Sequence, residues 1–372
     1  MQAVIKPTAI TGVVIAPASK SVMQRVCAAA WLRGGTTIVR NYGKSNDDRA
    51  ALQIIRDLGA AVKVIDDHTL EITAPENTVI PPSLSRIHCG ESGLSARMFT
   101  SVAAARALHR ITIEGEGSIN SRPMAFFDEI LPQLGVSVSS NEGRLPLKIK
   151  GPLQPRDITI DGSLSSQFLT GLLLAYGATT TAGVSIAVDQ LSSKPYIDLT
   201  LQVMEAFGLN VPRHEDYRIF HFPPNAAPVR DSGQRDFTVE GDWSNTAFLM
   251  VAGAIAGQVS VEGLDVFSVQ ADKKILEALQ ECGCRLSIQT ERIEVARRPL
   301  KAFHFNATDC PDLFPPLAAL AVYCAGTSVI EGVHRLLHKE SNRALTLQEE
   351  FGKLGIKIVL QDDMMIVYGG KV

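Results

Sequence analysis

The 372-residue sequence has no long apolar run and no block of like charges. It lacks the roughly 18 consecutive apolar residues of a membrane-spanning helix, and its first residues do not resemble an export signal. Lysine and arginine number 36 against 39 for aspartate and glutamate, a net charge of −3. The chain therefore offers no basic face for nucleic acid or an anionic membrane. We expect a cytoplasmic protein that binds neither.

The six cysteines form no C-x-x-C pair, and no histidine pair has zinc-ligand spacing. Neither a zinc site nor a disulfide framework is indicated, so a reducing compartment and no bound metal are expected. In contrast, 45% of the residues are apolar and only 20% are charged, which suits large packed cores rather than disorder. At about 150 residues per domain, the length favours two domains.

An internal repeat is the strongest signal in the sequence. Five times, a helix-like run ends in a glycine that is followed by short strands, and these glycines recur at intervals of 72 to 76 residues: Gly59, Gly135, Gly208, Gly283 and Gly355. Glycine suits the left-handed backbone that often follows a helix. The predicted unit is helix, strand, helix, strand, strand, over about 73 residues.

The first helix of every unit is almost wholly apolar, which places it in a core. These helices are expected at residues 22–32, 94–108, 168–176, 246–255 and 313–324. We predict an α/β fold of two domains built from these α+β repeats. Residues 18–239 would hold three units, and residues 1–17 with 240–372 would hold units four and five. The sixth unit would be incomplete, and residues 3–15 are predicted to be a strand pair that could complete a last unit.

The predicted buried helices begin with short polar residues: Ser19-Lys20-Ser21, Glu91-Ser92-Gly93, Ser165-Ser166-Gln167, Ser244-Asn245 and Cys310-Pro311-Asp312. Such residues cap helices, and capping alone explains any one of them. Several converging helix starts would also attract phosphate or carboxylate groups. Lys20 and Arg25 lie at a helix start, where a cation is unfavourable unless an anion compensates it.

Other cations fit the same interpretation. Arg97 and Arg122 could each bind an anion with two hydrogen bonds, although a lone arginine is more often a solvated surface group. Lys339 and Arg343 stand four residues apart at an expected helix start, where they would share one face. Taken alone, that pair is an ordinary charged helix start.

Taken in order along the chain, these motifs resemble the enolpyruvyl transferase family, in particular its branch that acts on shikimate 3-phosphate. The resemblance covers nearly the whole chain. It is carried by Ser19-Lys20-Ser21 with Arg25, Ser45-Asn46-Asp47-Asp48-Arg49, Arg122-Pro123, Ser163-Leu164-Ser165-Ser166-Gln167, Ser193-Lys194-Pro195-Tyr196, Glu240-Gly241-Asp242, Pro311-Asp312 and Lys339-Glu340-Ser341-Asn342-Arg343. It implies two domains of three units, with chain crossings near Pro17 and Val239.

The resemblance also implies an activity in the shikimate pathway of aromatic amino-acid biosynthesis. The enolpyruvyl group of phosphoenolpyruvate would pass to the 5-hydroxyl of shikimate 3-phosphate, with release of phosphate and without a cofactor. Such an addition and elimination needs a general acid and a general base. Asp312 is the expected base, Glu340 the expected acid, and Lys20 the cation that neutralises the departing phosphate.

The substrate ligands are implied by the same motifs. Shikimate 3-phosphate would meet Lys20, Ser21, Arg25, Ser165, Ser166, Gln167, Ser193, Tyr196, Asp312 and Lys339. Phosphoenolpyruvate would meet Lys20, Arg97, Arg122, Gln167 and Arg343.

Three features depart from the family pattern. Glu91 stands where the family has an amide, in the loop Gly90-Glu91-Ser92-Gly93-Leu94, and Arg335 stands where an asparagine usually contacts substrate phosphate. The family also continues for about one further unit that carries phosphoenolpyruvate ligands. A monomer is expected if that unit exists.

Two alternatives remain open. A sister enzyme that acts on a UDP-amino sugar would use a reactive cysteine in the second unit's loop, near Cys89, although the motifs at Ser165 and Lys339 argue against it. The other alternative is a non-catalytic relative that binds anions and lacks the C-terminal phosphoenolpyruvate ligands. A relative that processes RNA ends is disfavoured by the acidic charge balance.

Overall fold

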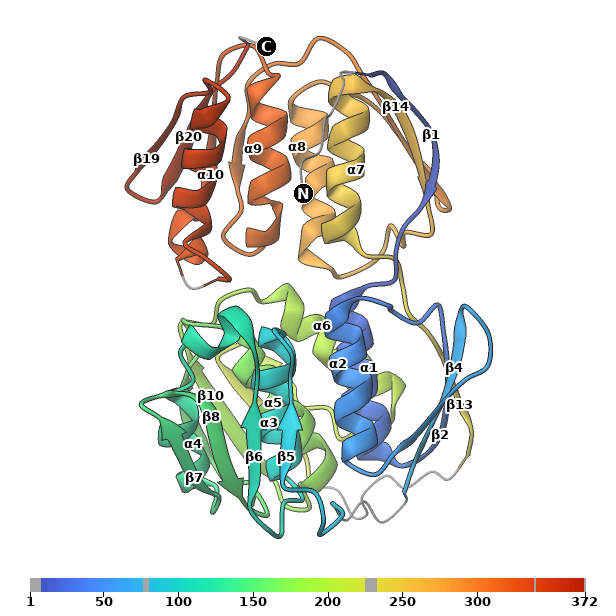
Figure 1. Cartoon of the computed structure of the whole chain (residues 1–372), viewed down its shortest axis with the longest axis vertical. Coiled ribbons are helices and arrows are strands. Elements are labelled where there is room, and N and C mark those ends of the chain that lie inside the picture. The colour runs from blue at the N-terminus through green and yellow to red at the C-terminus, as the bar shows by residue number, and fades with distance from the viewer. Residues whose placement is uncertain (1–7, 76–79, 225–232, 338, 371–372) are drawn as a thin grey trace. The chain divides into compact units, whose positions relative to one another are not determined.

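A computed structural model describes residues 8–75, 80–224, 233–337 and 339–370. The chain divides into two compact units (Figure 1). We call Ala18–Val239 the central unit, and Met1–Pro17 with Glu240–Val372 the terminal unit. Among the described residues, no helix is long and apolar enough to cross a membrane.

The described residues of the central unit form three four-stranded sheets. Their strands are β2 (Gly35–Arg40), β3 (Ala61–Val64), β4 (Thr69–Ala74), β5 (Arg86–His88), β6 (Ile111–Glu114), β7 (Ser137–Asn141), β8 (Arg144–Lys150), β9 (Ile158–Asp161), β10 (Val184–Asp189), β11 (Arg213–Glu215), β12 (Ile219–Phe222) and β13 (Arg235–Thr238). The strand orders are β13-β2-β4-β3, β5-β6-β8-β7 and β11-β12-β10-β9. In each sheet one edge strand runs parallel to its neighbour and the other pairings are antiparallel.

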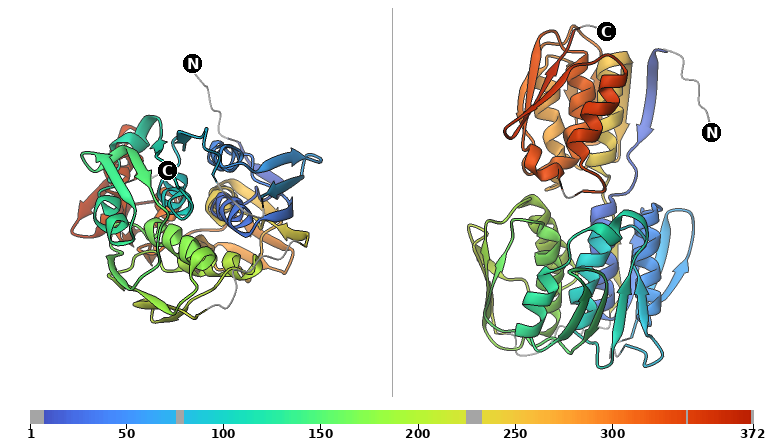
Figure 2. Two further views of the ribbon diagram at one scale, coloured as in Figure 1. Left: turned by 90° about the horizontal axis from the view of Figure 1, so that it is seen from below. Right: turned by 60° about the vertical axis from the view of Figure 1, so that its left-hand side comes forward.

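Helices fill the middle of the central unit, and its sheets lie toward the outside (Figure 2, left). The helices are α1 (Lys20–Arg33), α2 (Asn46–Asp57), α3 (Gly93–Ala104), α4 (Phe126–Gln133), α5 (Ser166–Thr179) and α6 (Pro195–Ala206), with a short 3₁₀ helix, η1 (Gly117–Ser121). Helices α1, α3 and α5 pack against one another, and nearly all of their residues are buried. As predicted, the apolar first helices form the core.

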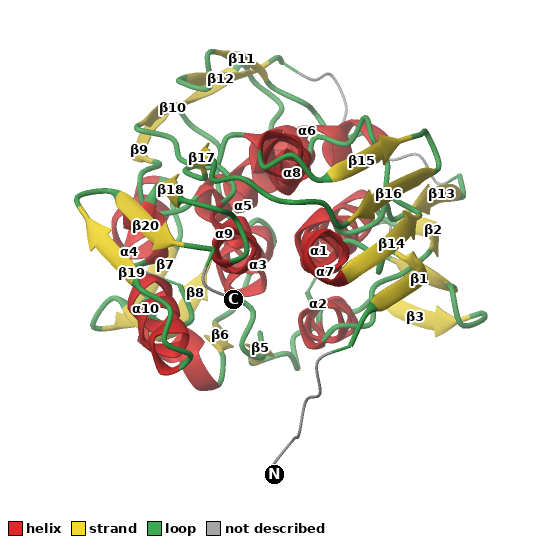
Figure 3. Ribbon diagram, turned by 90° about the horizontal axis from the view of Figure 1, so that it is seen from above, coloured by secondary structure: helices red, strands yellow, loops and turns green. Residues whose placement is uncertain are grey.

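The described residues of the terminal unit form two four-stranded sheets. The strands are β1 (Ile10–Ile15), β14 (Gly257–Glu262), β15 (Arg285–Ile288), β16 (Arg292–Ala296), β17 (His304–Asn306), β18 (Thr327–Glu331), β19 (Ile358–Gln361) and β20 (Met364–Tyr368). The helices are α7 (Trp243–Ala256), α8 (Ile275–Glu281), α9 (Phe314–Val322) and α10 (Arg343–Lys353), with η2 (Ala271–Lys274), η3 (Pro311–Leu313) and η4 (Val333–Leu336). The orders are β1-β14-β16-β15 and β17-β18-β20-β19 (Figure 3).

The predicted repeat is confirmed, with one strand added. All five repeat glycines have positive φ, between +66° and +98°. Each sheet contains a further parallel edge strand that the predicted unit lacks, such as β5 before α3, β9 before α5 and β17 before α9. These strands have only three or four residues, so they carry little alternation in hydrophobicity for a sequence pattern to reveal.

The prediction of a strand pair at residues 3–15 is wrong for the part that the structure describes. Residues Ile10–Ile15 form one strand, which runs parallel to β14 in the sheet of the fourth repeat rather than completing a last unit. Residues 3–7 of that prediction lie outside the described residues. The pairing depends on Gly257, where a Cβ atom would overlap the Ile10 carbonyl. The corresponding place in the first repeat's sheet is taken by β13, beside β2.

Candidate functional site

Three helix starts in the central unit are capped by serine, as predicted. The hydroxyl oxygens of Ser19, Ser92 and Ser165 accept hydrogen bonds from backbone N–H groups of the first turns, at 3.4, 3.1 and 3.3 Å. In the terminal unit the predicted caps are corrected. Asp242, not Ser244, caps α7 at 2.7 Å, and Cys310 makes no side-chain cap because the chain enters α9 through η3.

Hydrogen bonds join the first turns of α1, α3 and α5. Gln24 of α1 accepts from the hydroxyls of Ser92 and Ser95, each at 2.8 Å. Arg97 of α3 donates to Gln167 of α5 at 3.0 Å. The positive ends of three helices therefore meet in one part of the central unit, an arrangement that favours bound anions.

Two buried guanidinium groups lie at the start of α3. Only 4% of Arg97 and 6% of Arg122 is exposed. A Cβ atom on Gly93 would overlap Nη1 of Arg122 and would stand 3.6 Å from the Gln167 side-chain oxygen. Two cations that share such a place repel each other and have lost hydration, so a carboxylate or phosphate would stabilise both. Three of the predicted phosphoenolpyruvate ligands, Arg97, Arg122 and Gln167, thus lie close together, and their binding of that substrate stays a prediction.

Arg25 joins three helices of the central unit. Its guanidinium is buried and donates to Thr200, to Thr170, and to the backbone oxygens of Ser21 and Tyr196, at 2.8 to 3.4 Å. Burial lowers its pKa to about 10. Arg25 therefore fixes α1, α5 and α6 against one another, and its direct binding of phosphate stays a prediction.

Of the other predicted ligands in the central unit, Ser21 lies in the first turn of α1, and the rest lie at the starts of α5 and α6. Ser166 is in the first turn of α5, and Ser193 and Tyr196 flank the start of α6. Ser193 is 5% exposed and holds φ at +56°, a conformation that costs a serine energy and is found more often at functional sites. The backbone oxygen of Tyr196 is one of the groups held by Arg25.

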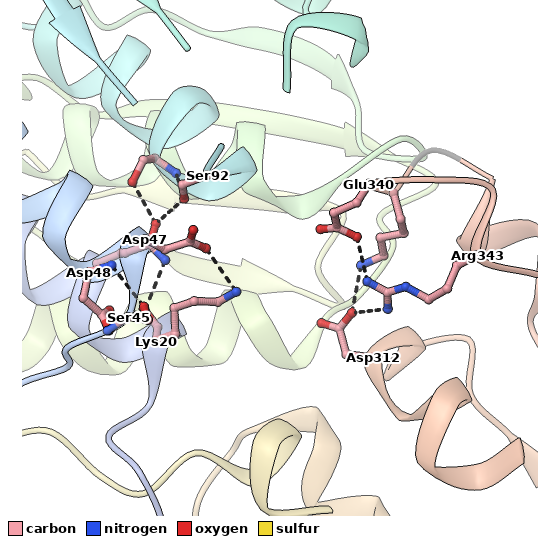
Figure 4. Close-up of polar contacts among 11 residues, drawn as sticks. Lys20, Ser45, Asp47, Asp48, Ser92, Asp312, Glu340 and Arg343 are labelled. Atoms are coloured by element: carbon pink, nitrogen blue, oxygen red, sulfur yellow. Dashed lines mark hydrogen bonds and ion pairs between the residues drawn. The ribbon is translucent and has the colours of Figure 1, made fainter. Parts of the chain in front are cut away.

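Lys20 forms an ion pair that the sequence reasoning missed. Its ammonium lies 3.0 Å from a carboxylate oxygen of Asp47 on α2 (Figure 4). About half of the Lys20 side chain is exposed, so an incoming anion can reach it. Asp47 belongs to one of the motifs that carry the family resemblance. Its acidic side chain in the first turn of α2 was the only local signal that could have pointed to this ion pair.

The neighbouring Asp48 is a buried carboxyl group that closes a capping box. It accepts from the backbone N–H and the hydroxyl of Ser45, at 2.9 and 2.7 Å (Figure 4). Burial raises the pKa of Asp48 to about 6, although both hydrogen bonds from Ser45 oppose that shift. Between about pH 4 and pH 6, the folded chain therefore keeps a proton on Asp48, whereas an unfolded aspartate, with a pKa near 3.9, releases it.

This difference predicts that stability falls as the pH rises. Between about pH 4 and pH 6 the folded state binds more protons at Asp48 than the unfolded state, so the free energy of unfolding declines by up to about 3 kcal/mol. We expect Asp48→Asn to remove this part of the pH dependence, as measured by urea unfolding at pH 4 and pH 7. Asp67→Asn, at an exposed position, is the control. Equal slopes in wild type and Asp48→Asn would contradict the prediction.

In the terminal unit, two predicted cations meet at the carboxylate of Asp312 (Figure 4). Oδ1 of Asp312 lies 2.8 Å from Nη1 of Arg343 and 3.4 Å from Nζ of Lys339. Arg343 also contacts Oε2 of Glu340 at 2.8 Å through Nη2. Burial opposes the charge of Arg343, but Asp312 and Glu340 raise its pKa above the ordinary value.

The predicted helical face for Lys339 and Arg343 is wrong. The side chain of Asn342 caps the helix by accepting from the Leu345 backbone N–H at 3.3 Å, so α10 begins at Arg343. Lys339 lies before the helix and reaches Asp312 from there. Arg335, on η4, faces Asp309 and Asp312, and burial lowers its pKa despite these two carboxylates.

Glu91, the first departure from the family pattern, supports a neighbouring loop. Its carboxylate accepts from the backbone N–H of Ser118 at 3.3 Å. Gly117 has φ +61°, and a Cβ atom there would overlap the Glu91 carboxylate. Glu91 thus holds the start of η1, and Arg122 follows the end of η1.

We expect Gly117→Ala to lower the free energy of unfolding by about 1–3 kcal/mol, because it adds a strained φ and displaces Glu91. Glu91→Ala in the same chain should recover part of that loss, a coupling of more than about 0.5 kcal/mol in urea unfolding. Gly283→Ala is the matched control, since φ there is +82° with no atom within 4 Å of the added Cβ. Additive effects of the two substitutions would show that the contact contributes nothing.

Cys89 does not resemble a reactive thiol. It is completely buried, and burial raises its pKa to about 12. A nucleophilic cysteine needs a lowered pKa and some exposure. This argues against the alternative that the chain acts on a UDP-amino sugar through this cysteine.

Comparison with known proteins decides the relationship. The sequence pattern of the EPSP synthase (3-phosphoshikimate 1-carboxyvinyltransferase) family matches residues 4–372. The chain belongs to this family. The 3-phosphoshikimate 1-carboxyvinyltransferase of Aeropyrum pernix is 33% identical over 99% of this chain and 83% of its own length. That of Clostridium novyi is 30% identical over 98% of this chain and 84% of its own length.

Solved structures of related proteins share the fold. EPSP synthase from Acinetobacter baumannii matches with a TM-score of 0.78 at 24% identity, over 98% of this chain and 83% of that one. The enolpyruvyl transferase NikO from Streptomyces tendae matches with a TM-score of 0.71 at 16% identity, over 97% of this chain and 82% of that one. The predicted α/β fold of the enolpyruvyl transferase type is confirmed.

Proposed function

We propose that this chain transfers the enolpyruvyl group of phosphoenolpyruvate to the 5-hydroxyl of shikimate 3-phosphate and releases inorganic phosphate. The observation that carries the proposal is the relationship, along nearly the whole chain, to enzymes named for that reaction. Both substrates are anions, and the residues predicted from the sequence motifs include the cations described above.

In the central unit, Arg97, Arg122 and Gln167 bind the carboxylate and phosphate of phosphoenolpyruvate. Their support is the burial of both guanidinium groups beside Gln167. Lys20 exchanges its partner Asp47 for substrate phosphate and neutralises the charge that develops as phosphate leaves. Ser165, Ser166, Ser193 and Tyr196 bind shikimate 3-phosphate, and Arg25 positions the backbone around them.

In the terminal unit, Asp312 removes the proton of the 5-hydroxyl as the oxygen attacks the central carbon of the enolpyruvyl group. Lys339 and Arg343 both contact its Oδ1, and nearby cations favour the ionised carboxylate that a base requires. The same two cations are the proposed ligands for substrate anions.

Glu340 donates the proton that the methylene carbon gains in the addition step. Its present contact with Arg343 favours the ionised form instead. We therefore propose that a substrate anion replaces Glu340 on Arg343, after which the carboxyl group can hold a proton. The acid would then be ready only when substrate is bound, which limits proton transfer to the occupied site.

The test is a two-substrate assay of the purified chain, in which released phosphate and the enolpyruvyl product are both measured, the latter by mass spectrometry. We expect one product molecule for each phosphate, and no phosphate when either substrate is omitted. Phosphate release that does not need shikimate 3-phosphate would refute the proposal. Calorimetric binding of shikimate 3-phosphate without turnover, and without binding of phosphoenolpyruvate, would identify the non-catalytic relative instead.

A further inference from the structure

The hairpin that joins β11 to β12 ends in a strained turn. The Arg218 backbone N–H donates to the Glu215 carbonyl at 2.8 Å, and the two residues between them, Asp216 and Tyr217, have φ of +49° and +60°. Two-residue turns of this kind favour glycine, asparagine and aspartate, because larger side chains crowd the backbone when φ is positive. A tyrosine in this conformation is costly, and residues kept at such a cost are found more often at functional sites.

The Tyr217 side chain contacts the beginning of α6. Its hydroxyl donates to the Asp198 carboxylate and lies 2.8 Å from both carboxylate oxygens. The Lys194 ammonium lies over the Tyr217 ring, 5.5 Å from the ring centroid. Asp198 belongs to the first turn of α6, and Lys194 immediately precedes the helix. One side chain of the hairpin thus holds two residues of this helix start.

The hairpin in turn fixes Tyr217. The His214 ring stacks on the Tyr217 ring with 4.4 Å between the centroids, and Nδ1 of His214 accepts from the Tyr217 backbone N–H at 3.3 Å. The Arg218 carbonyl accepts from the backbone N–H of Val188 on β10 at 2.7 Å. The turn is therefore joined to the strand from which the chain runs on to α6.

The start of α6 depends on contacts from outside the helix. Serine hydroxyls cap α1, α3 and α5, whereas Lys194 occupies the capping position of α6. An ammonium group has no acceptor for the backbone N–H groups of a first turn, so Lys194 cannot cap the helix. Ser193, directly before it, has φ of +56°. The contacts of Tyr217 supply support that a capping side chain would otherwise give.

We propose that Tyr217 is a positioning residue for shikimate 3-phosphate, which acts through Asp198 and Lys194 on the start of α6. Ser193 and Tyr196, two proposed ligands of that substrate, flank this start, so a shift of the first turn moves both. The inference rests on the proposed function. Ligands that hold parts of the substrate away from the reacting atoms bind substrate and transition state equally, so a fault in their position raises KM and leaves kcat unchanged.

The experiment compares Tyr217→Phe with wild type in steady-state kinetics with both substrates. Phenylalanine keeps the aromatic ring beside His214 and Lys194, and it removes only the hydroxyl that donates to Asp198. We expect the KM for shikimate 3-phosphate to rise about 3- to 10-fold, which is part of what a hydrogen bond to a charged group contributes. The KM for phosphoenolpyruvate and kcat should change by less than about twofold.

Tyr176→Phe is the matched control. It also removes one tyrosine hydroxyl from the central unit, in this case a hydroxyl on α5 that donates to the Arg156 carbonyl at 2.9 Å. Urea unfolding measures the general loss of stability in both variants, whereas the KM for shikimate 3-phosphate should rise only in Tyr217→Phe.

A double-mutant cycle with Asp198→Ala tests the route of the effect. Both substitutions break the same contact between Tyr217 and Asp198, so their effects on the KM for shikimate 3-phosphate should not add. Once Asp198→Ala is present, Tyr217→Phe should raise that KM by less than about twofold. The single variant Tyr217→Phe decides the question if Asp198→Ala does not fold.

Several results would overturn the inference. An unchanged KM for shikimate 3-phosphate in Tyr217→Phe would show that the hydroxyl does not position the site. An equal rise in the KM of both substrates, or the same rise in Tyr176→Phe, would show a general loss of structure. Full additivity in the cycle would mean that the hydroxyl acts by another route. A wild-type chain that neither binds shikimate 3-phosphate in calorimetry nor releases phosphate would remove the proposed function, and this inference with it.

Discussion

Replacing Asp312 with asparagine should lower kcat by about 10²- to 10⁴-fold, the loss typical of removing a general base. The amide keeps the shape of the carboxyl group and can still accept hydrogen bonds from Lys339 and Arg343, which now contact Oδ1. It cannot accept a proton from the 5-hydroxyl. Steady-state kinetics with both substrates, together with a urea unfolding curve, measure the effect.

The matched control is Glu350→Gln on α10, where the carboxylate forms an exposed ion pair with Lys353. Exposed pairs of this kind contribute little to stability, so kcat should stay unchanged. If Asp312→Asn retains more than about a tenth of wild-type kcat, another group removes the proton. If both kcat and the unfolding curve change, Asp312 acts mainly as the partner of two cations.

The repeat could be predicted from the sequence because its signals are local. A glycine past a helix end, such as Gly59 or Gly355, reports its own backbone conformation, and both have positive φ. An apolar helix such as α5 reports its own burial. By contrast, the place of β1 beside β14 depends on residues more than 240 positions apart. Nothing in the sequence of Ile10–Ile15 specifies that partner.

The same distinction holds for the candidate site, where contacts within one helix could be predicted and contacts between helices could not. Ser19 and Ser92 were recognisable as caps because a cap bonds to the next turn of its own helix. The contacts of Arg25 with α5 and α6 could not be predicted, because a sequence does not show which helices a buried guanidinium will hold together. The Asp47 partner of Lys20 was missed for a related reason: the pair joins two helices.

The second large effect on kcat is expected at the Lys20–Asp47 pair. Lys20→Met should lower kcat by about 10²- to 10³-fold, because it removes the cation that stabilises the departing phosphate. The methionine keeps most of the side-chain length and leaves the Ser19 cap in place. Kinetics should also show a raised KM for both substrates, since Lys20 is the proposed ligand of both. Lys63→Met, at an exposed position on β3, is the control and should leave every kinetic constant unchanged.

Asp47→Asn separates charge compensation from catalysis. In the free chain Asp47 holds the Lys20 ammonium at 3.0 Å, so a substrate phosphate must compete with that carboxylate. The amide removes the competing charge, and we expect KM to fall while kcat changes little, because Lys20 itself remains. A kcat loss in Asp47→Asn as large as that of Lys20→Met would mean that Asp47 holds Lys20 in its active position during the reaction. Unchanged kcat in Lys20→Met would exclude Lys20 from the chemistry altogether.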